Sequence, residues 1–382
     1  MLRVLCWGTY DTSKPRTRIL RDGLRVAGAT VEECHATVWE GIEDKSQVPG
    51  SLRRLALLVR WLACYPGLIW RFLRAPRPDL VLLGYPGVLD VIVAAPFARL
   101  RGVPVVWDMF MSLYDTVVQD RQMIGPRSLV ARLLHAVEGL ALRSAELVLL
   151  DTEAHARYVE SLYGLPSRHC GAVWVGAEVE HFRVPEPASP APRPPGASLR
   201  VLFYGQLIPL HGIDTIVEAA RLMAEDPVEW TLVGRGQESA SIRRRLAETP
   251  LPKLRWIEWV DYTDLKDRIA EADLCLGIFG TSDKAASVIP NKVFQIVAGG
   301  RPLVTRDSPA IREFLEPVPG CVYLIRPGDA RALVDAVREH AKGAAAAGRP
   351  PCHAALIDKI GSEAIARQFR ELISRRLGLG RA

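Results

Sequence analysis

A lysine at the expected start of a helix is the residue of this chain best placed for anion chemistry. Lys292 follows Pro290 and Asn291, and its helix is expected to end at Gly299-Gly300. Proline is tolerated at a helix entrance because the first N–H groups lack intrahelical partners, and glycine suits the left-handed turn that ends a helix. Free backbone donors, the positive end of the helix dipole and an ammonium group favour an anion, most simply a phosphate. A solvated lysine in an ordinary loop–helix–strand unit explains the same residues equally well.

A second polar group follows the first expected strand, Leu2–Trp7. The loop from Gly8 to Arg18 contains Tyr10 and Arg16 and leads into a helix. In parallel α/β sheets ligands bind beyond the carboxyl ends of the strands, so this loop is a candidate site. A solvated surface loop is the alternative.

Acidic residues follow a later strand, Pro104–Asp108. Asp108 stands at the strand end, and Asp115 and Asp120 follow among methionines and aromatics. A catalytic or sugar-binding side chain is expected at the position of Asp108. The alternative is a loop whose acids only cap the next helix.

Strands and helices that alternate regularly must position these groups. In each half of the chain, continuous apolar strands separated by helical patterns indicate a parallel sheet covered on both faces. We therefore predict an α/β fold of two Rossmann-like doubly wound domains that face a central cleft. The predicted parts are an N-terminal domain in residues 1–183, a linker with six prolines in 184–198, a second domain in 199–350, and a C-terminal helix in 351–382 that packs toward the first domain.

Composition restricts the class of protein without choosing the ligand. The chain has 382 residues, 49% apolar and 24% charged, which indicates a globular protein of two domains. Its net charge of +6 does not separate nucleic acid, anionic lipid and phosphate ligands. The seven cysteines form no CxxC pair and no Cys/His group with zinc spacing, so we expect reduced thiols and a cytoplasmic location.

Residues 51–74 are basic and amphipathic, with an interruption near Pro66-Gly67. No apolar run long enough to span a bilayer is expected here, because arginines interrupt the apolar residues: Arg53, Arg54, Arg60, Arg71 and Arg74. Such a helix pair either rests on an anionic membrane or packs on its domain with solvated arginines. Both interpretations stay open. Outside this segment no basic patch interleaved with aromatics is visible, so no nucleic-acid partner is expected.

Four motifs of the second half, in the correct order and spacing, resemble a known family. They are YGQLIPLHG at 204–212, LVGRG at 232–236, ADLCLGIF at 272–279 and IPNKVFQIVAGGRPLV at 289–304. They resemble the first-loop, LxGxG, ADxxxxPS and PxKxxExxAxGxPVV motifs of retaining glycosyltransferases of the two-Rossmann (GT-B) type, family four. The first half matches more loosely.

The resemblance implies a nucleotide-sugar on the second domain and a glycan, lipid-linked or small-molecule acceptor on the first. It implies catalytic roles for Lys292, Asp108 and Arg235, with charge neutralised by the protein instead of a metal. The donor-binding residues would be Gly205, Gln206, His211, Gly234, Gly236, Val260, Ser287, Pro290, Asn291 and Gln295. The acceptor-side residues would be Gly8, Tyr10, Arg16, Arg18 and Asp115.

Several positions depart from the family pattern. Gln206 and His211 replace the usual arginine and lysine of the first loop, and Ser287 and Gln295 replace a pair of glutamates. These changes leave open altered donor choice or a catalytically reduced protein that binds a nucleotide-sugar or a lipid. An NAD-type oxidoreductase is disfavoured, because the G-x-G-x-x-G fingerprint is absent after Trp7 and Gly234-Arg-Gly236 lacks its third glycine.

Overall fold

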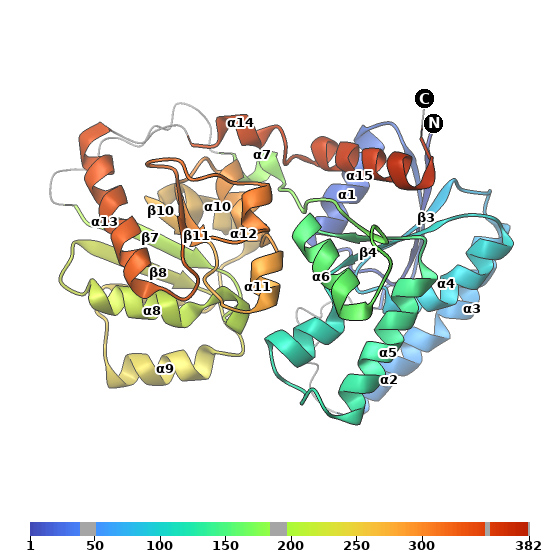
Figure 1. Cartoon of the computed structure of the whole chain (residues 1–382), viewed down its shortest axis with the longest axis horizontal. Helices are drawn as coiled ribbons and strands as arrows, with labels where there is room; N and C mark the ends of the chain where they lie inside the picture. Colours follow the sequence, from blue (N-terminus) through green and yellow to red (C-terminus); the bar gives the residue numbers. More distant parts are fainter. Residues whose placement is uncertain (39–50, 184–196, 348–351, 381–382) are drawn as a thin grey trace. The chain divides into compact units, whose positions relative to one another are not determined.

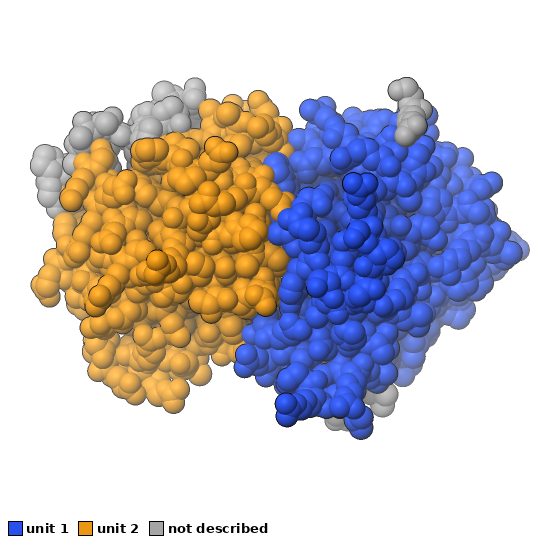
Figure 2. All heavy atoms as spheres, in the orientation of Figure 1, with its two compact units in different colours: residues 1–175, 362–382 blue, residues 176–361 orange. Residues whose placement is uncertain are grey.

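The chain divides into two compact units. The computed structural model describes residues 1–38, 51–183, 197–347 and 352–380. Unit 1 comprises residues 1–175 and 362–382, and unit 2 comprises residues 176–361 (Figure 2). The predicted linker at 184–198 lies almost entirely outside the described residues. The first boundary falls earlier than predicted, because the short helix α7 (Val179–Phe182) packs against α12 (Asn291–Ala298) of unit 2.

Unit 1 is built on a six-stranded parallel sheet in the order β2-β1-β3-β4-β5-β6. Because the order reverses between β1 and β3, the carboxyl ends of these two strands flank a topological switch point. The elements are β1 (Arg3–Gly8), α1 (Pro15–Val26), β2 (Thr30–His35), α2 (Ser51–Ala63), α3 (Tyr65–Arg74), β3 (Leu80–Leu83), α4 (Val88–Leu100), β4 (Val105–Phe110), the π-helix η2 (Asp115–Asp120), α5 (Leu129–Ser144), β5 (Leu147–Leu150), α6 (Glu153–Tyr163), β6 (Cys170–Ala172) and α15 (Ser362–Leu377).

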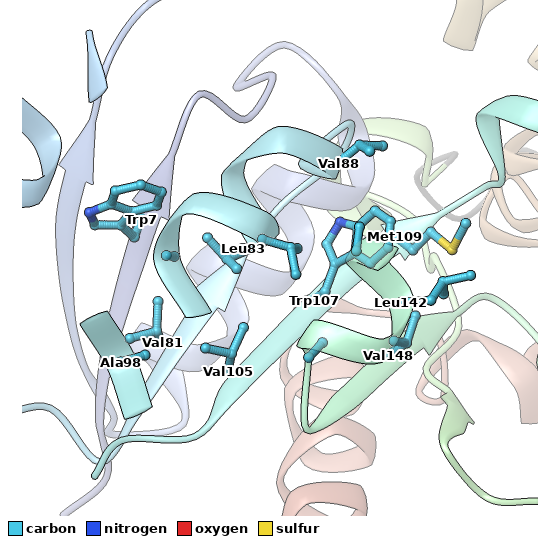
Figure 3. Close-up of a cluster of buried hydrophobic side chains, with 14 of the residues drawn as sticks. Trp7, Val81, Leu83, Val88, Ala98, Val105, Trp107, Met109, Leu142 and Val148 are labelled. Carbon is cyan, nitrogen blue, oxygen red and sulfur yellow. The ribbon is translucent and has the colours of Figure 1, made fainter. Parts of the chain in front are cut away.

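Helices cover both faces of this sheet. One face packs against α3, α4, α5 and α6, and Figure 3 shows part of that core, with Trp7, Leu83, Trp107 and Met109 on the sheet side. The other face packs against α1 and α15, which lie side by side (Figure 1). The last helix of the chain therefore completes the core of the first unit, through Ile365, Phe369 and Ile373.

Unit 2 repeats the design with the strand order β12-β11-β10-β7-β8-β9, which places a switch point between β7 and β10. Its elements, besides α7 and α12, are β7 (Leu199–Tyr204), η3 (Pro209–His211), α8 (Ile213–Leu222), β8 (Val228–Val233), α9 (Ser239–Glu248), β9 (Leu254–Ile257), α10 (Tyr262–Glu271), β10 (Leu274–Leu276), α11 (Asp283–Ser287), β11 (Leu303–Arg306), η4 (Ile311–Glu313), β12 (Val322–Ile325), α13 (Ala330–Ala347) and α14 (Ala354–Ile357). Two doubly wound parallel sheets confirm the predicted fold class.

Two sequence-based expectations need correction. Cys321 and Cys352 form a disulfide, which the spacing of single cysteines did not indicate, because the two residues are 31 positions apart. The other five cysteines are free. The residues Ala56–Arg74, across α2 and α3, are also long and apolar enough to cross a membrane by length and composition, contrary to expectation. That criterion is weak evidence here, because Tyr65, Leu68 and Phe72 on α3 are buried in the core of unit 1.

Candidate functional site

Two glycine turns meet at the carboxyl ends of the neighbouring strands β7 and β8, next to the switch point of unit 2. Gly205 follows β7 and Gly234 follows β8, with φ values of 137° and 134° that favour glycine. A Cβ on Gly234 would lie 1.9 Å from the Gly205 carbonyl oxygen, and one on Gly236 would lie 2.5 Å from that of Leu207. The two turns therefore pack backbone against backbone, with the Leu207 amide donating to the Arg235 carbonyl at 3.1 Å. Gly234 therefore needs glycine for both its φ and its backbone contact, and Gly236 needs glycine for its backbone contact.

Lys292 occupies the space that Gly205 leaves open. A Cβ on Gly205 would lie 2.9 Å from the Lys292 Nζ. The amine also lies 3.7 Å from the centroid of the Phe203 ring, and within the described residues it has no hydrogen-bond partner. The residue is 5% exposed, and burial lowers the pKa of its amine well below the usual 10.5. A buried amine without a partner is costly, so this amine is suited to a ligand that brings negative charge.

His211 lies on the other side of the same space. Its Cε1 would be 3.2 Å from a Cβ on Gly205, and its Nδ1 faces the carbonyl oxygen of Gln206. His211 stands where the family pattern has the lysine of the first loop, and Lys292 reaches the same turn from helix α12. Sequence spacing could not indicate this, because Gly205 and Lys292 are far apart in the chain.

Four further predicted donor residues lie on or beside α11 and α12. Ser287 is buried, and its hydroxyl donates to the Lys284 carbonyl at 3.0 Å. Gln295 lies one turn after Lys292 and is 7% exposed. Pro290 is the N-cap residue of α12 and Asn291 its first residue, both half-buried. No side chain caps this helix end.

Arg235 lies in a more open place than Lys292. It is exposed, and its guanidinium lies 5.3 Å from the centroid of the Trp259 ring. Trp259 is itself 55% exposed and stands next to the half-buried Val260, in the loop after β9. An exposed indole beside an arginine offers a flat surface on which a planar ring can stack.

At the switch point of unit 1, a buried carboxylate holds the turn after β1. Asp90, on the first turn of α4, accepts hydrogen bonds from the Thr9 amide at 2.7 Å, the Thr9 hydroxyl at 3.0 Å and the Tyr65 hydroxyl at 2.7 Å. Gly8 has a φ of 112°, and a Cβ there would lie 2.4 Å from the Asp90 carboxylate. Burial raises the pKa of Asp90, and the three donors oppose that rise. Asp90 thus fixes the start of the loop from Gly8 to Arg18.

Asp108 and Arg16, both predicted as site residues, are paired with each other. The guanidinium of Arg16 lies 2.6 Å from the Asp108 Oδ1, and both side chains are 3% exposed. Arg16 also donates to the carbonyl oxygens of Val173 at 2.8 Å and Leu150 at 3.3 Å. The pair therefore ties α1 to the carboxyl ends of β4, β5 and β6. It commits the Asp108 carboxylate to Arg16, so Asp108 is placed to act through Arg16 and not on a substrate directly.

The other predicted acceptor-side residues point to different neighbours. Tyr10 is buried and its hydroxyl donates to Glu33 at 2.8 Å. Arg18 is half-buried and donates to the carbonyl oxygen of Ser13. Asp115, on the π-helix η2, is buried and accepts a hydrogen bond from the Tyr158 hydroxyl at 2.8 Å. Single-turn π-helices are frequent at functional sites, so η2 is a candidate part of the site.

Sequence reasoning missed Asp90 and Glu138. Glu138, on α5, is fully buried and accepts from the Leu113 amide at 2.7 Å, the Tyr114 amide at 2.9 Å and the hydroxyls of Ser112 and Tyr163. It fixes the segment that leads into η2. A single acid among the apolar and basic residues of a helix is the signal that could have found either residue, since a carboxylate in such a place is buried only with several donors. Within the described ranges, no group of three His, Cys, Asp or Glu side chains could hold a metal ion.

Comparison with protein families gives one match for each half of the chain. Residues 1–176 match the model of the glycosyl transferase 4-like domain, and residues 198–342 match that of glycosyl transferases group 1. Among curated proteins, the putative colanic acid biosynthesis glycosyl transferase WcaI of Escherichia coli K12 is 23% identical over 141 residues. That match covers 36% of this chain and 34% of WcaI, so it spans about a third of the length of this relative.

Solved structures match over the whole chain. Sucrose-phosphate synthase from Thermosynechococcus elongatus gives a TM-score of 0.72 at 16% identity, with 100% of both chains covered. HepE from Anabaena, solved in complex with UDP, gives 0.66 at 16% identity and covers 98% of this chain and 100% of its own. The catalytic domain of starch synthase IV from Arabidopsis thaliana, bound to ADP and acarbose, gives 0.66 at 10% identity, with 99% of both chains covered. At these identities the likeness shows a shared fold.

Proposed function

The chain belongs to the glycosyltransferases, with a GT4-like domain followed by a group 1 domain, and we propose that it moves a sugar from a nucleotide-sugar donor to an acceptor with retention of the anomeric configuration. The observation that carries this proposal is the buried amine of Lys292 beside the Gly205 turn, for which the described part of the chain provides no hydrogen-bond partner. HepE was solved with UDP and with UDP-glucose, which supports a nucleoside diphosphate as the anion.

Lys292 would neutralise the leaving group. In the proposed reaction the bond between the anomeric carbon and the diphosphate oxygen breaks, and the acceptor oxygen bonds to the same face of that carbon. The acceptor proton passes to the departing diphosphate. A preorganised cation in a site of low dielectric stabilises charge that develops in such a transition state. Burial lowers the pKa of the Lys292 amine, and the negative charge of a bound diphosphate would act in the opposite direction and favour the charged form.

The neighbouring residues have supporting roles in this proposal. Gly205, Gly234 and Gly236 let the backbone approach the phosphates, and Trp259 with Arg235 offers the surface on which the nucleobase stacks. His211 adds a second polar group at the diphosphate, and Gln295 a hydrogen bond to the donor ribose without the charge of a glutamate. With Lys292 at the diphosphate, we propose that the reaction proceeds without a metal ion.

Unit 1 would hold the acceptor at the loop from Gly8 to Arg18 and at Asp115. Asp108 is a positioning residue in this proposal, because its carboxylate reaches the loop through Arg16. We further propose that the enzyme works in the cytoplasm and that residues 51–74 contact the inner face of an anionic membrane. The five free thiols agree with a reducing compartment, and the Cys321–Cys352 pair is the exception.

A screen of nucleotide-sugars by thermal shift tests the donor site. A donor that binds the folded chain raises the melting temperature by mass action, and Lys292→Met should abolish most of that shift and of turnover. Lys266→Met, on the exposed face of α10, is the matched control and should leave both unchanged. Equal shifts and turnover in Lys292→Met and wild type would contradict the role of Lys292. Binding without turnover in the wild type would favour a nucleotide-sugar-binding protein, the alternative suggested by Gln206 and Gln295.

A further inference from the structure

The helices that cover one face of the unit 1 sheet expose a concentration of large apolar side chains. Helices α3, α4 and α5 lie next to one another in this layer, and α2 leads into α3. We call their solvent side the outer face of α2–α5. Single exposed apolar residues are ordinary on protein surfaces, but a concentration on neighbouring helices indicates an interaction site. The exposed residues are Leu58, Val59, Leu62, Trp70, Leu73, Leu100, Leu129, Val130, Leu133 and Leu140.

The charged side chains that the four helices themselves expose are all of one sign, although Glu146, just after α5, lies 3.7 Å from Arg99. The acidic side chains of these four helices, Asp90 and Glu138, are both 0% exposed. The exposed charged side chains among the described residues of the four helices are therefore arginines, namely Arg60, Arg71, Arg74, Arg99, Arg132 and Arg143. On the opposite side of the sheet the charges are mixed, since α1 and α15 expose Asp22, Glu363 and Glu371 beside their arginines.

Arginines interleaved with leucines and a tryptophan match the surface of an anionic bilayer. The guanidinium of Arg74 lies 4.4 Å from the centroid of the Trp70 ring, so a cation and an amphipathic aromatic stand together on the surface. On a bilayer, such arginines meet lipid phosphates while the adjacent apolar side chains enter the boundary of the acyl chains. The inner face of α3, with Leu68 and Phe72, stays in the protein core, so the layer lies on the membrane and does not span it.

The same helices are hydrogen-bonded to the loop after β1. Trp61, on α2, donates from its indole N–H to the Thr9 hydroxyl at 3.0 Å. Tyr65, on α3, donates to Asp90 at 2.7 Å, and Asp90 holds the Thr9 amide. A surface contact that orders α2 and α3 therefore also orders the start of the loop from Gly8 to Arg18.

We propose that the outer face of α2–α5, and not residues 51–74 alone, docks on a bilayer that carries anionic lipid, and that docking orders the loop from Gly8 to Arg18 for a membrane-borne acceptor. The ordering of this loop for an acceptor rests on the proposed function, in which the loop forms the acceptor side. The docking itself does not depend on any transfer activity.

Flotation with vesicles tests the docking. Wild type should float with vesicles of phosphatidylcholine and phosphatidylglycerol and much less with phosphatidylcholine alone. Arg74→Glu/Arg132→Glu and, separately, Leu129→Ser/Leu133→Ser should lose most of that binding, with unchanged circular dichroism and melting temperature. Arg367→Glu/Arg375→Glu on α15 changes the net charge equally and should float like wild type. Equal flotation of the control and the face variants would overturn the proposal, as would a failure of wild type to float. Dimerisation through this face without flotation would also overturn it.

Hydrogen exchange tests the connection to the loop. Addition of the anionic vesicles should slow amide exchange between Thr9 and Arg18 in the wild type. Trp61→Phe keeps an aromatic ring but lacks the N–H donor, so it should still float while the slowing is reduced. Unchanged slowing in Trp61→Phe would overturn the connection. Because neither experiment uses a donor, failure here is distinguishable from failure of the donor thermal shift, which uses no vesicles.

Discussion

Removal of the Asp108 carboxylate should destabilise unit 1 strongly. Asp108 and Arg16 are each 3% exposed at the side chain and lie 2.6 Å apart, so Asp108→Ala leaves a buried guanidinium without its counter-charge. Breaking a buried ion pair by removal of one partner costs about 3–5 kcal/mol. Arg16 keeps its hydrogen bonds to the carbonyl oxygens of Val173 and Leu150, which compensate part of the loss. We therefore expect the lower end of that range, about 3 kcal/mol of the free energy of unfolding.

Urea unfolding measures this change, with native-state hydrogen exchange of the β4 and β5 amides to report unit 1 by itself. The double variant Arg16→Met/Asp108→Ala leaves no buried charge. Its loss of unfolding free energy should therefore be smaller than the sum of the losses in the two single variants. The buried-pair reasoning would be refuted if Asp108→Ala cost less than about 1 kcal/mol, the value of an exposed pair. It would also be refuted if the single changes were additive in the double variant.

Three further outcomes are expected. Because burial lowers the pKa of Lys292, the folded chain binds fewer protons than the unfolded chain between that lowered pKa and 10.5. The free energy of unfolding, measured by urea titration, should therefore rise with pH across this window. Lys292→Met should flatten that rise. Gly234→Ala should lower the melting temperature and weaken donor binding, because its Cβ would lie 1.9 Å from the Gly205 carbonyl oxygen; a variant with wild-type stability would contradict the packing of the two turns. Glu138→Gln should lower the free energy of unfolding by about 1–3 kcal/mol in urea titrations, because an amide NH2 would face donors that the carboxylate accepts from. Unchanged stability would show that these donors find other partners.

The sequence predicted the sheets well, because their signals are local. Apolar strands separated by amphipathic helices reveal a parallel sheet wherever they occur. The boundary within 51–74 was placed near Pro66-Gly67, while the structure ends α2 at Ala63 and starts α3 at Tyr65, since proline is tolerated in the first turn of a helix. The segment around Asp115 was expected to be a loop and forms a π-helix, held by the side chain of Glu138 from a helix later in the chain.

The candidate site was predictable in its residue types and not in their partners. Asp108 and Arg16 were both selected, but their ion pair joins positions 92 residues apart, which no periodicity reports. The Lys292 amine was assigned to an anion from its place in α12, yet its position beside Gly205 depends on the winding of the second sheet. Asp90 and Glu138 are the single acids of α4 and α5, and their structural roles appear only once their donors are assembled in three dimensions.

The packing of α15 on α1 has a consequence for how the protein is made. Chain synthesis runs from the first residue to the last, so unit 2 is complete at residue 361, before the helix that finishes the unit 1 core has left the ribosome. Until Ile365, Phe369 and Ile373 arrive, the part of this sheet face that α1 does not cover stays open to water. The unit that begins first is therefore the one that finishes folding last, and a nascent chain that stops short of residue 362 would expose the apolar surface that α15 covers, for chaperones to bind.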